Sequence, residues 1–146
     1  MGVPGFRDDG WLPEGHHAAT WEEVIDRFGG SPGSQRDRVL RKLLNWKDEL
    51  KAKGASGYVV LDGSFVSSKE LPGDFDVLVV IDEHLRDSFE NDIEAHELID
   101  YSKCKKAGFD MLPFFSNLIS QNPDYLKVWD IDDRTGVYKG VLRVAL

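Results

Sequence analysis

Short apolar runs bounded by glycine, proline or charged residues recur along the chain and predict β-strands. They lie at residues 58–61, 75–81, 109–115 and 140–145, and branched or aromatic side chains dominate them. Each run has the length of a buried strand rather than that of a helix. The chain therefore contains the elements of a small sheet, with longer polar segments between its strands.

The segments between these runs predict helices. Thr20 is a suitable N-cap, and Glu23 three residues later completes a capping box for a short helix that ends near Phe28. A stronger helix follows the turn at residues 31–33 and carries an apolar stripe of Val39, Leu43, Trp46 and Leu50. Residues 87–106 favour helix with only fair periodicity, and a short helix is expected at 117–121.

These elements predict an α+β fold, a two-layer arrangement in which a small mixed sheet has helices mainly on one side. The 146 residues suit a single domain. Within it, residues 1–33 would form an N-terminal arm and the short helix, and residues 34–146 the core. Glycine, proline and aspartate make the first 14 residues extended, and Trp11 and Trp21 are expected to hold this arm to the domain.

The composition limits which partners the protein is expected to bind and in which cellular compartment it is expected to work. A formal net charge of −8 and a pI near 4.9 oppose bulk attraction to nucleic acid. The single Cys104 cannot form an internal disulfide, and no apolar segment has the length of a signal peptide or membrane span. A soluble, cytoplasmic protein is therefore expected. Basic residues on the second helix are open to two readings, a solvated face or a polyanion contact: Arg36, Arg38, Arg41, Lys42 and Lys47.

The clearest candidate chemistry lies around the second predicted strand. Asp74 and Asp76 are two residues apart, so on a strand they would share a face and could share a divalent cation, while Phe75 points to the core. Gly63 and Ser64 follow the first strand, where a turn or short helix would expose amides to phosphate oxygens. The pattern indicates a site for a metal ion and a phosphate group.

Further residues extend this candidate site. Asp110 on the third predicted strand could supply another carboxylate, with Asp92 or Asp100 as alternatives if that strand is misplaced. Basic residues either contact a triphosphate or keep the surface solvated: Lys69, Lys103, Lys105 and Lys106.

Other polar groups have simpler interpretations. His16 and His17 lack partner ligands nearby, which favours surface or packing roles over metal binding. The acidic loop of Trp129, Asp130, Asp132 and Asp133 lacks the glycine and final glutamate of a calcium loop.

In order and spacing, these motifs resemble those of the polymerase-beta-like nucleotidyltransferase superfamily. That superfamily has a Gly-Ser turn, here Gly63 and Ser64, an Asp-x-Asp pair on the next strand, here Asp74 and Asp76, and a third aspartate, here Asp110. More closely, residues 12–16, 19–23, 61–66 and 136–141 resemble a bacterial and phage family of uncharacterised nucleotidyltransferase-like proteins. The resemblance implies the superfamily's fold over nearly the whole chain.

The resemblance also implies an activity. A magnesium-dependent enzyme, with manganese as the alternative ion, would move a nucleoside monophosphate from a triphosphate such as ATP to a hydroxyl on protein, RNA or a small molecule. Asp74 and Asp76 would bind one ion, and with Asp110 a second, and Asp110 could accept the proton. The triphosphate would contact Gly63, Ser64 and Lys69.

A second hypothesis from the same resemblance is a regulatory module with nucleotide binding but little turnover, such as the antitoxin-like partner of a helical protein. The intact aspartates favour the enzyme. Large members of the superfamily carry a further helical domain that grips the acceptor. Here a partner protein or a second subunit is expected to hold it, as in toxin–antitoxin pairs by analogy. Membrane and bulk nucleic-acid partners are not expected.

Overall fold

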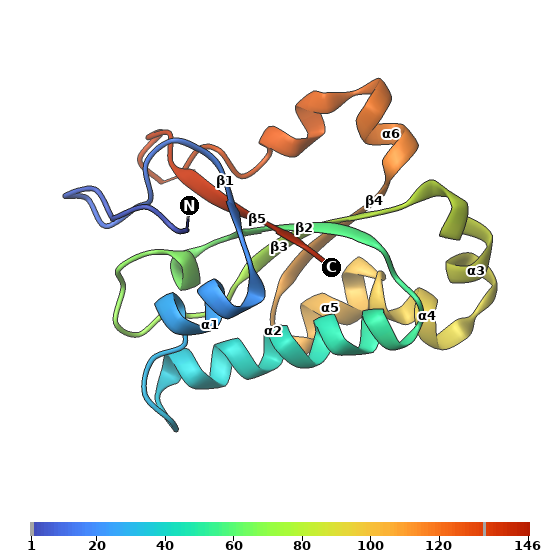
Figure 1. Cartoon of the computed structure of the whole chain (residues 1–146), viewed down its shortest axis with the longest axis horizontal. Helices are drawn as coiled ribbons and strands as arrows, with labels where there is room; N and C mark the ends of the chain where they lie inside the picture. Colours follow the sequence, from blue (N-terminus) through green and yellow to red (C-terminus); the bar gives the residue numbers. More distant parts are fainter. Residues whose placement is uncertain (1, 133) are drawn as a thin grey trace.

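The structure is a computed structural model that describes residues 2–132 and 134–146. A five-stranded mixed sheet of order β1-β5-β2-β3-β4 forms its centre (Figure 1). Its strands are β1 (Gly15–Ala19), β2 (Gly57–Asp62), β3 (Asp76–Ile81), β4 (Asp110–Phe115) and β5 (Gly140–Ala145). The apolar runs predicted as strands all lie in this sheet, within one residue of the expected bounds. The α+β class is confirmed.

Strand pairing brings the end of β2 and the starts of β3 and β4 together at one end of the sheet. β2 runs antiparallel to β3 and β5, whereas β4 is parallel to β3 and β1 is parallel to β5. In this register Asp76 lies opposite Asp62 on one side and opposite Asp110 on the other. The end of β2 and the starts of β3 and β4 therefore lie side by side.

Most helices cover one face of the sheet, as predicted (Figure 1). On that face lie α1 (Trp21–Phe28), α2 (Gln35–Ala52), α3 (Arg86–Asn91), α4 (Ile93–Leu98) and α5 (Tyr101–Ala107). Over the other face lie α6 (Ser116–Gln121) and the 3-10 helix η3 (Pro123–Lys127). Two further 3-10 turns follow β2 and β3, η1 (Ser64–Val66) and η2 (Glu83–Leu85).

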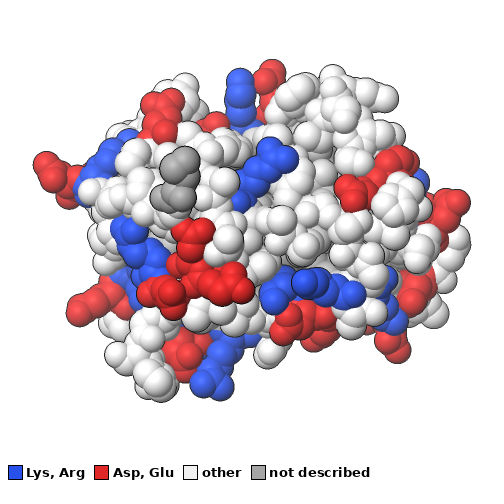
Figure 2. All heavy atoms as spheres, viewed as in Figure 1, with Lys and Arg blue, Asp and Glu red and all other residues white. Residues whose placement is uncertain are grey.

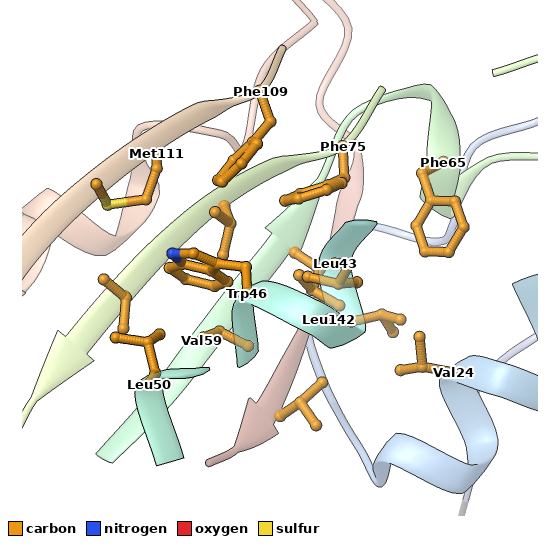
Figure 3. Packing of buried hydrophobic residues seen from close by; sticks show 14 of the residues in the cluster. Val24, Leu43, Trp46, Leu50, Val59, Phe65, Phe75, Phe109, Met111 and Leu142 are labelled. Carbon is orange, nitrogen blue, oxygen red and sulfur yellow. The ribbon is translucent and has the colours of Figure 1, made fainter. Parts of the chain in front are cut away.

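Aromatic side chains fill the space between the sheet and α2 (Figure 3). The rings of Phe75 and Phe109 stack with centroids 4.6 Å apart, and Trp46 meets Phe109 edge-on at 5.8 Å. Phe75 is fully buried, which confirms that it points into the core. The predicted stripe of α2 is buried at every position, Val39, Leu43, Trp46 and Leu50.

Local capping explains where the helices begin. The capping box of Thr20 and Glu23 forms as predicted, with both reciprocal hydrogen bonds present. The expected helix over 87–106 is divided into three because Asp92 and Asp100 each cap a new helix by accepting a backbone N–H three residues later. These two acids therefore lie at the starts of helices and off the sheet.

Strand β1 was not predicted. Its sequence, Gly-His-His-Ala-Ala, lacks the branched side chains that indicate a strand, and it lies at the edge of the sheet beside β5. The strand depends on parallel pairing with β5, which begins at Gly15 and Gly140. The segment 1–33 thus contributes a strand as well as the arm and α1. Across the described ranges, no helix combines the length and apolar character needed to cross a membrane.

Candidate site at the ends of three neighbouring strands

Three carboxylates form a row across the sheet, and we refer to Asp62, Asp76 and Asp110 as the acid row. Asp62 is the last residue of β2, while Asp76 and Asp110 are the first residues of β3 and β4. Residues paired in register project from the same face, so all three lie on the face opposite α2. Directly opposed residues have Cβ atoms roughly 5 Å apart, which places like charges close together.

The Gly63–Ser64 turn lies against the middle acid. Gly63 has φ +88° and ψ −177°, a region that essentially only glycine occupies. A Cβ atom at this position would be 3.1 Å from Asp76 Oδ2 and 3.2 Å from its backbone nitrogen. The Ser64 hydroxyl accepts a hydrogen bond from the backbone N–H of Gly73 at 3.2 Å. The turn is therefore fixed to the segment that precedes β3.

Arg36 of α2 holds the loop that follows this turn. Its guanidinium donates to the carbonyls of Phe65 at 2.7 Å, Ser67 at 2.6 Å and Lys69 at 2.5 Å. Burial lowers the pKa of Arg36. The sequence indicated Arg36 only as one of several basic residues on a helix, so its structural role was missed. These hydrogen bonds join residues 29 to 33 apart in the chain, so no local sequence pattern predicts them.

Asp76 is the least compensated acid of the row. It is half-buried, and no described residue donates a hydrogen bond or forms an ion pair to its carboxylate. Burial raises the pKa of Asp76 to about 6, with further contributions from the charges of Asp62 and Asp110. A carboxylate in this position would be stabilised by a cation.

Asp62 is buried and pairs with the buried Lys139, which immediately precedes β5. Burial raises the pKa of Asp62 and outweighs the opposing effect of Lys139. The Lys139 ammonium also lies 4.8 Å from the centre of the Trp11 ring. Sequence reasoning missed this pair as a site. The available signals were an aspartate closing an apolar strand and a lysine next to the apolar run 140–145.

The two other predicted metal ligands have lysine partners. Asp74 lies before the start of β3, so strand alternation does not place its side chain on the same face as that of Asp76. It pairs instead with Lys42 of α2 at 2.9 Å. Asp110 pairs with Lys105 at 2.7 Å. Among the described residues, no group of three or more histidine, cysteine, aspartate or glutamate side chains is arranged to hold a metal ion.

A cavity of about 340 Å³ opens beside the acid row. Of the predicted site residues, it is lined by Gly63, Ser64, Lys69 and Asp76, but not by Asp74 or Asp110. Its other walls come from the arm, the end of β2 and the loop before β5, with Trp11, Asp62, Trp129, Asp132, Arg134 and Lys139. An adjoining cavity of about 230 Å³ shares Trp11, Ser64 and Lys69. We refer to the cavity of about 340 Å³ as the cleft.

The charges in this cleft balance. Among its described lining residues, Lys69, Arg134 and Lys139 offset three aspartates, Asp62, Asp76 and Asp132. Acidic and basic side chains are similarly interspersed over the face of the molecule shown in Figure 2. A larger cavity, about 500 Å³, lies between α2, α4 and α5, and its lining includes Lys42 but no member of the acid row. The smaller cleft is therefore the candidate site.

The two histidines and Lys103 have local partners. His16 contacts Asp130 at 3.0 Å, and His17 contacts the Pro13 carbonyl at 2.6 Å, in agreement with surface and packing roles. Lys103 pairs with Glu97 at 3.5 Å. Asp133, named with the acidic loop, lies outside the described residues.

Comparison with known proteins gives a family but no activity. No curated protein and no solved structure matches the chain. One family profile matches residues 4–145, nearly the whole length. The chain therefore belongs to the DUF6932 family, a family of unknown function.

Proposed function

We propose that the protein is a magnesium-dependent nucleotidyltransferase that moves a nucleoside monophosphate from a nucleoside triphosphate to a hydroxyl acceptor. The observation that carries the proposal is the contact between the Gly63–Ser64 turn and Asp76 at the wall of one cleft. This contact joins a turn suited to phosphate with a carboxylate that lacks a counter-charge. Both are required in a site that handles a polyanion together with a divalent cation.

The topology supports the same reading. The turn connects β2 to the antiparallel β3, and β4 lies parallel beside β3 with Asp110 at its start. This succession of turn, next strand and later strand is the one that the resemblance to polymerase-beta-like nucleotidyltransferases implies for Gly63, Asp76 and Asp110. The helices behind the sheet hold β3 and β4 through Phe75 and Phe109, which fixes the positions of Asp76 and Asp110.

The donor set suits magnesium. Carboxylate oxygens are the ligands that this hard cation prefers, and a cation would offset the burial and the like charges that raise the pKa of Asp76. Asp74 and Asp110 would have to exchange their lysines, but Lys42 and Lys105 are 39% and 59% exposed in their side chains. Partly exposed ion pairs of this kind contribute little, so the exchange costs little. Bound magnesium would neutralise phosphate charge and lower the pKa of the acceptor hydroxyl.

The chain's own residues would divide the remaining tasks. The backbone at Gly63 admits a phosphate group closely, and the Ser64 hydroxyl, which accepts from Gly73, still has its proton to donate. Lys69 lines the same cleft and would bind the triphosphate. Asp110, at the neighbouring strand end, would accept the acceptor's proton.

The acceptor would be bound outside this cleft. A cavity of about 340 Å³ has room for a nucleotide but not for a macromolecular acceptor as well. A partner protein or a second subunit would present the hydroxyl, and a pairing of the toxin–antitoxin kind fits this requirement. Such a reaction with ATP belongs in the cytoplasm.

One observation favours a second candidate, a regulatory module that binds nucleotide without turnover. Asp74 and Asp110 are each ion-paired with a lysine, and only Asp76 of the predicted ligands lines the cleft. If those pairs persist with nucleotide bound, the protein would lack the ligands for two ions.

A labelling experiment separates these candidates. The protein is incubated with each α-labelled nucleoside triphosphate, magnesium or manganese, and cell lysate, and transfer of label to any acceptor is followed. We expect transfer by the wild type and less than about 1% of it by Asp76→Asn, since metal-ligand removal costs several kcal/mol of transition-state stabilisation.

The matched control is Asp87→Asn. Asp87 is exposed in the first turn of α3, so this variant removes the same charge away from the cleft and should transfer label normally. Nucleotide binding without transfer by the wild type would support the regulatory module. Equal transfer by wild type and Asp76→Asn would exclude Asp76 as a ligand and overturn the proposed site.

A further inference from the structure

Lys139 is a buried cation at the edge of the cleft. Its side chain is 5% exposed, and it is the lysine that the structure buries most deeply among the described residues. An ammonium group has three N–H donors. One is directed to Asp62, and the Trp11 ring lies 4.8 Å away, but no second oxygen acceptor is present among the described residues. At least one donor is therefore available in a place nearly closed to bulk water.

Stability alone does not account for this pair. Burying two charges costs several kcal/mol per ion, and apolar residues of similar volume often give equal or greater stability. Asp62 follows the buried Leu61 in β2, and Lys139 comes two residues before the buried Val141 of β5. Charged groups retained at this cost in a cleft indicate a ligand.

We propose that Lys139 binds a phosphate group of a ligand in the cleft and that Asp62 serves as the counter-ion of Lys139 when the ligand is absent. The chemical class is a polyphosphate chain. That this chain is the tail of a nucleoside triphosphate rests on the proposed function, whereas the contact between Lys139 and phosphate does not.

The surrounding groups favour a polyphosphate over a single small anion. Three cations line the cleft from two segments, Lys69 after the Gly63–Ser64 turn and Arg134 and Lys139 in the loop before β5, and the turn itself lines the same cleft. Points of positive charge spread along a cleft match an anion with several charged groups. Because three aspartates balance them, the cleft should accept a polyphosphate only together with a divalent cation.

The test must remove the ammonium without leaving a buried unpaired carboxylate. Lys139→Met alone would leave the Asp62 carboxylate buried and unpaired, which could unfold the protein. The comparison is therefore between Asp62→Asn and the double variant Asp62→Asn/Lys139→Met. Asparagine keeps an oxygen that can accept from Lys139, and circular dichroism confirms that both variants are folded.

Binding of inorganic tripolyphosphate with magnesium is measured by titration calorimetry. Asp62→Asn should bind at least as tightly as the wild type, because Lys139 no longer shares its charge with a carboxylate. The double variant should bind roughly 10-fold or more weakly than Asp62→Asn, the loss expected for one charge-assisted hydrogen bond. Lys51→Met, an exposed lysine at the end of α2, is the control and should bind as the wild type does.

Equal binding by Asp62→Asn and the double variant would overturn the proposal, and so would absence of tripolyphosphate binding by the wild type. Titrations with ATP and AMP distinguish the source of the phosphates. ATP bound more tightly than tripolyphosphate indicates a nucleotide, and the reverse indicates an inorganic polyphosphate. The labelling assay is independent of this comparison, so loss of the proposed function leaves the Lys139 result interpretable.

Discussion

The two faces of the sheet differ sharply at the same end of the same strands. Toward α2, Phe75 and Phe109 stack within the hydrophobic core. On the opposite face, the residue after each of them, Asp76 and Asp110, belongs to the acid row. Strand alternation thus places a well-packed core and a group of like charges on either side of one backbone. The first stabilises the fold, and the second opposes it.

This difference indicates how the site is held. Repulsion within the acid row and burial of Asp62 and Lys139 cost free energy that the aromatic face offsets. Changes on the aromatic face should therefore lower stability, whereas neutralising Asp76, the acid of the row without a paired cation, should raise it. Four substitutions test this contrast.

The largest loss is expected from Phe75→Ala. Removing a fully buried ring that stacks on Phe109 at 4.6 Å should lower the free energy of unfolding by about 4 kcal/mol. Urea denaturation followed by circular dichroism measures it. Phe75→Leu, which keeps most of the volume, should lose less than half as much. A loss below 1 kcal/mol for Phe75→Ala would show that this face is not the source of stability.

The next effect is on the charged face. Lys139→Met should cost about 3 kcal/mol because it leaves the Asp62 carboxylate buried without a partner. Asp62→Asn/Lys139→Met should recover most of that loss. The deficit of the single variant should also shrink as pH falls, since an uncompensated buried carboxylate has a raised pKa and becomes neutral. A deficit that is independent of pH and equal in the double variant would assign the loss to packing instead.

The sequence predicted the aromatic face better than the charged one. The apolar side chains of residues 75–81 and 109–115 predict strands without reference to the rest of the chain. The helical spacing of the α2 stripe likewise predicts a helix. β1 could not be found this way because it depends on pairing with β5 at the far end of the chain. The division of residues 87–106 into three helices was missed because Asp92 and Asp100 can either cap a new helix or lie within a continuous one, and the sequence does not decide between these roles.

The same distinction applies to the candidate site. Gly63, Ser64 and Asp76 belong to local motifs, and the structure brings them together as expected. The pair of Asp62 and Lys139 joins residues 77 apart in the chain, and neither has a local pattern that indicates the other. The lysine partners of Asp74 and Asp110 are set by tertiary packing for the same reason.

A smaller loss is expected from Gly63→Ala. The φ of +88° with extended ψ is accessible essentially to glycine alone, and the added methyl group would press on Asp76 at 3.1 Å. The free energy of unfolding should fall by about 2 kcal/mol, as measured in urea. Gly73→Ala, in a position without nearby atoms or positive φ, is the control and should stay within 0.5 kcal/mol. Equal effects of the two substitutions would show that the turn tolerates a side chain.

The smallest change is a gain, expected from Asp76→Asn. The pKa of Asp76 is raised from 3.8 to about 6, so charging it opposes folding. The full shift corresponds to about 3 kcal/mol, and partial exposure to solvent reduces this to about 1 kcal/mol. Above pH 6 the variant should therefore unfold at a higher urea concentration than the wild type. Asp87→Asn should show no such gain.

The pH dependence gives the sign of this effect independently. Below about pH 3 Asp76 is protonated in both folded and unfolded chains, so wild type and Asp76→Asn should be equally stable. As pH rises from 3 to 6, the unfolded chain loses this proton first and the wild type loses stability that the variant keeps. Magnesium should close the gap above pH 6 by stabilising only the wild type. A variant less stable than the wild type at pH 8 in EDTA would mean that Asp76 accepts a stabilising contact, and the two faces would then not oppose one another.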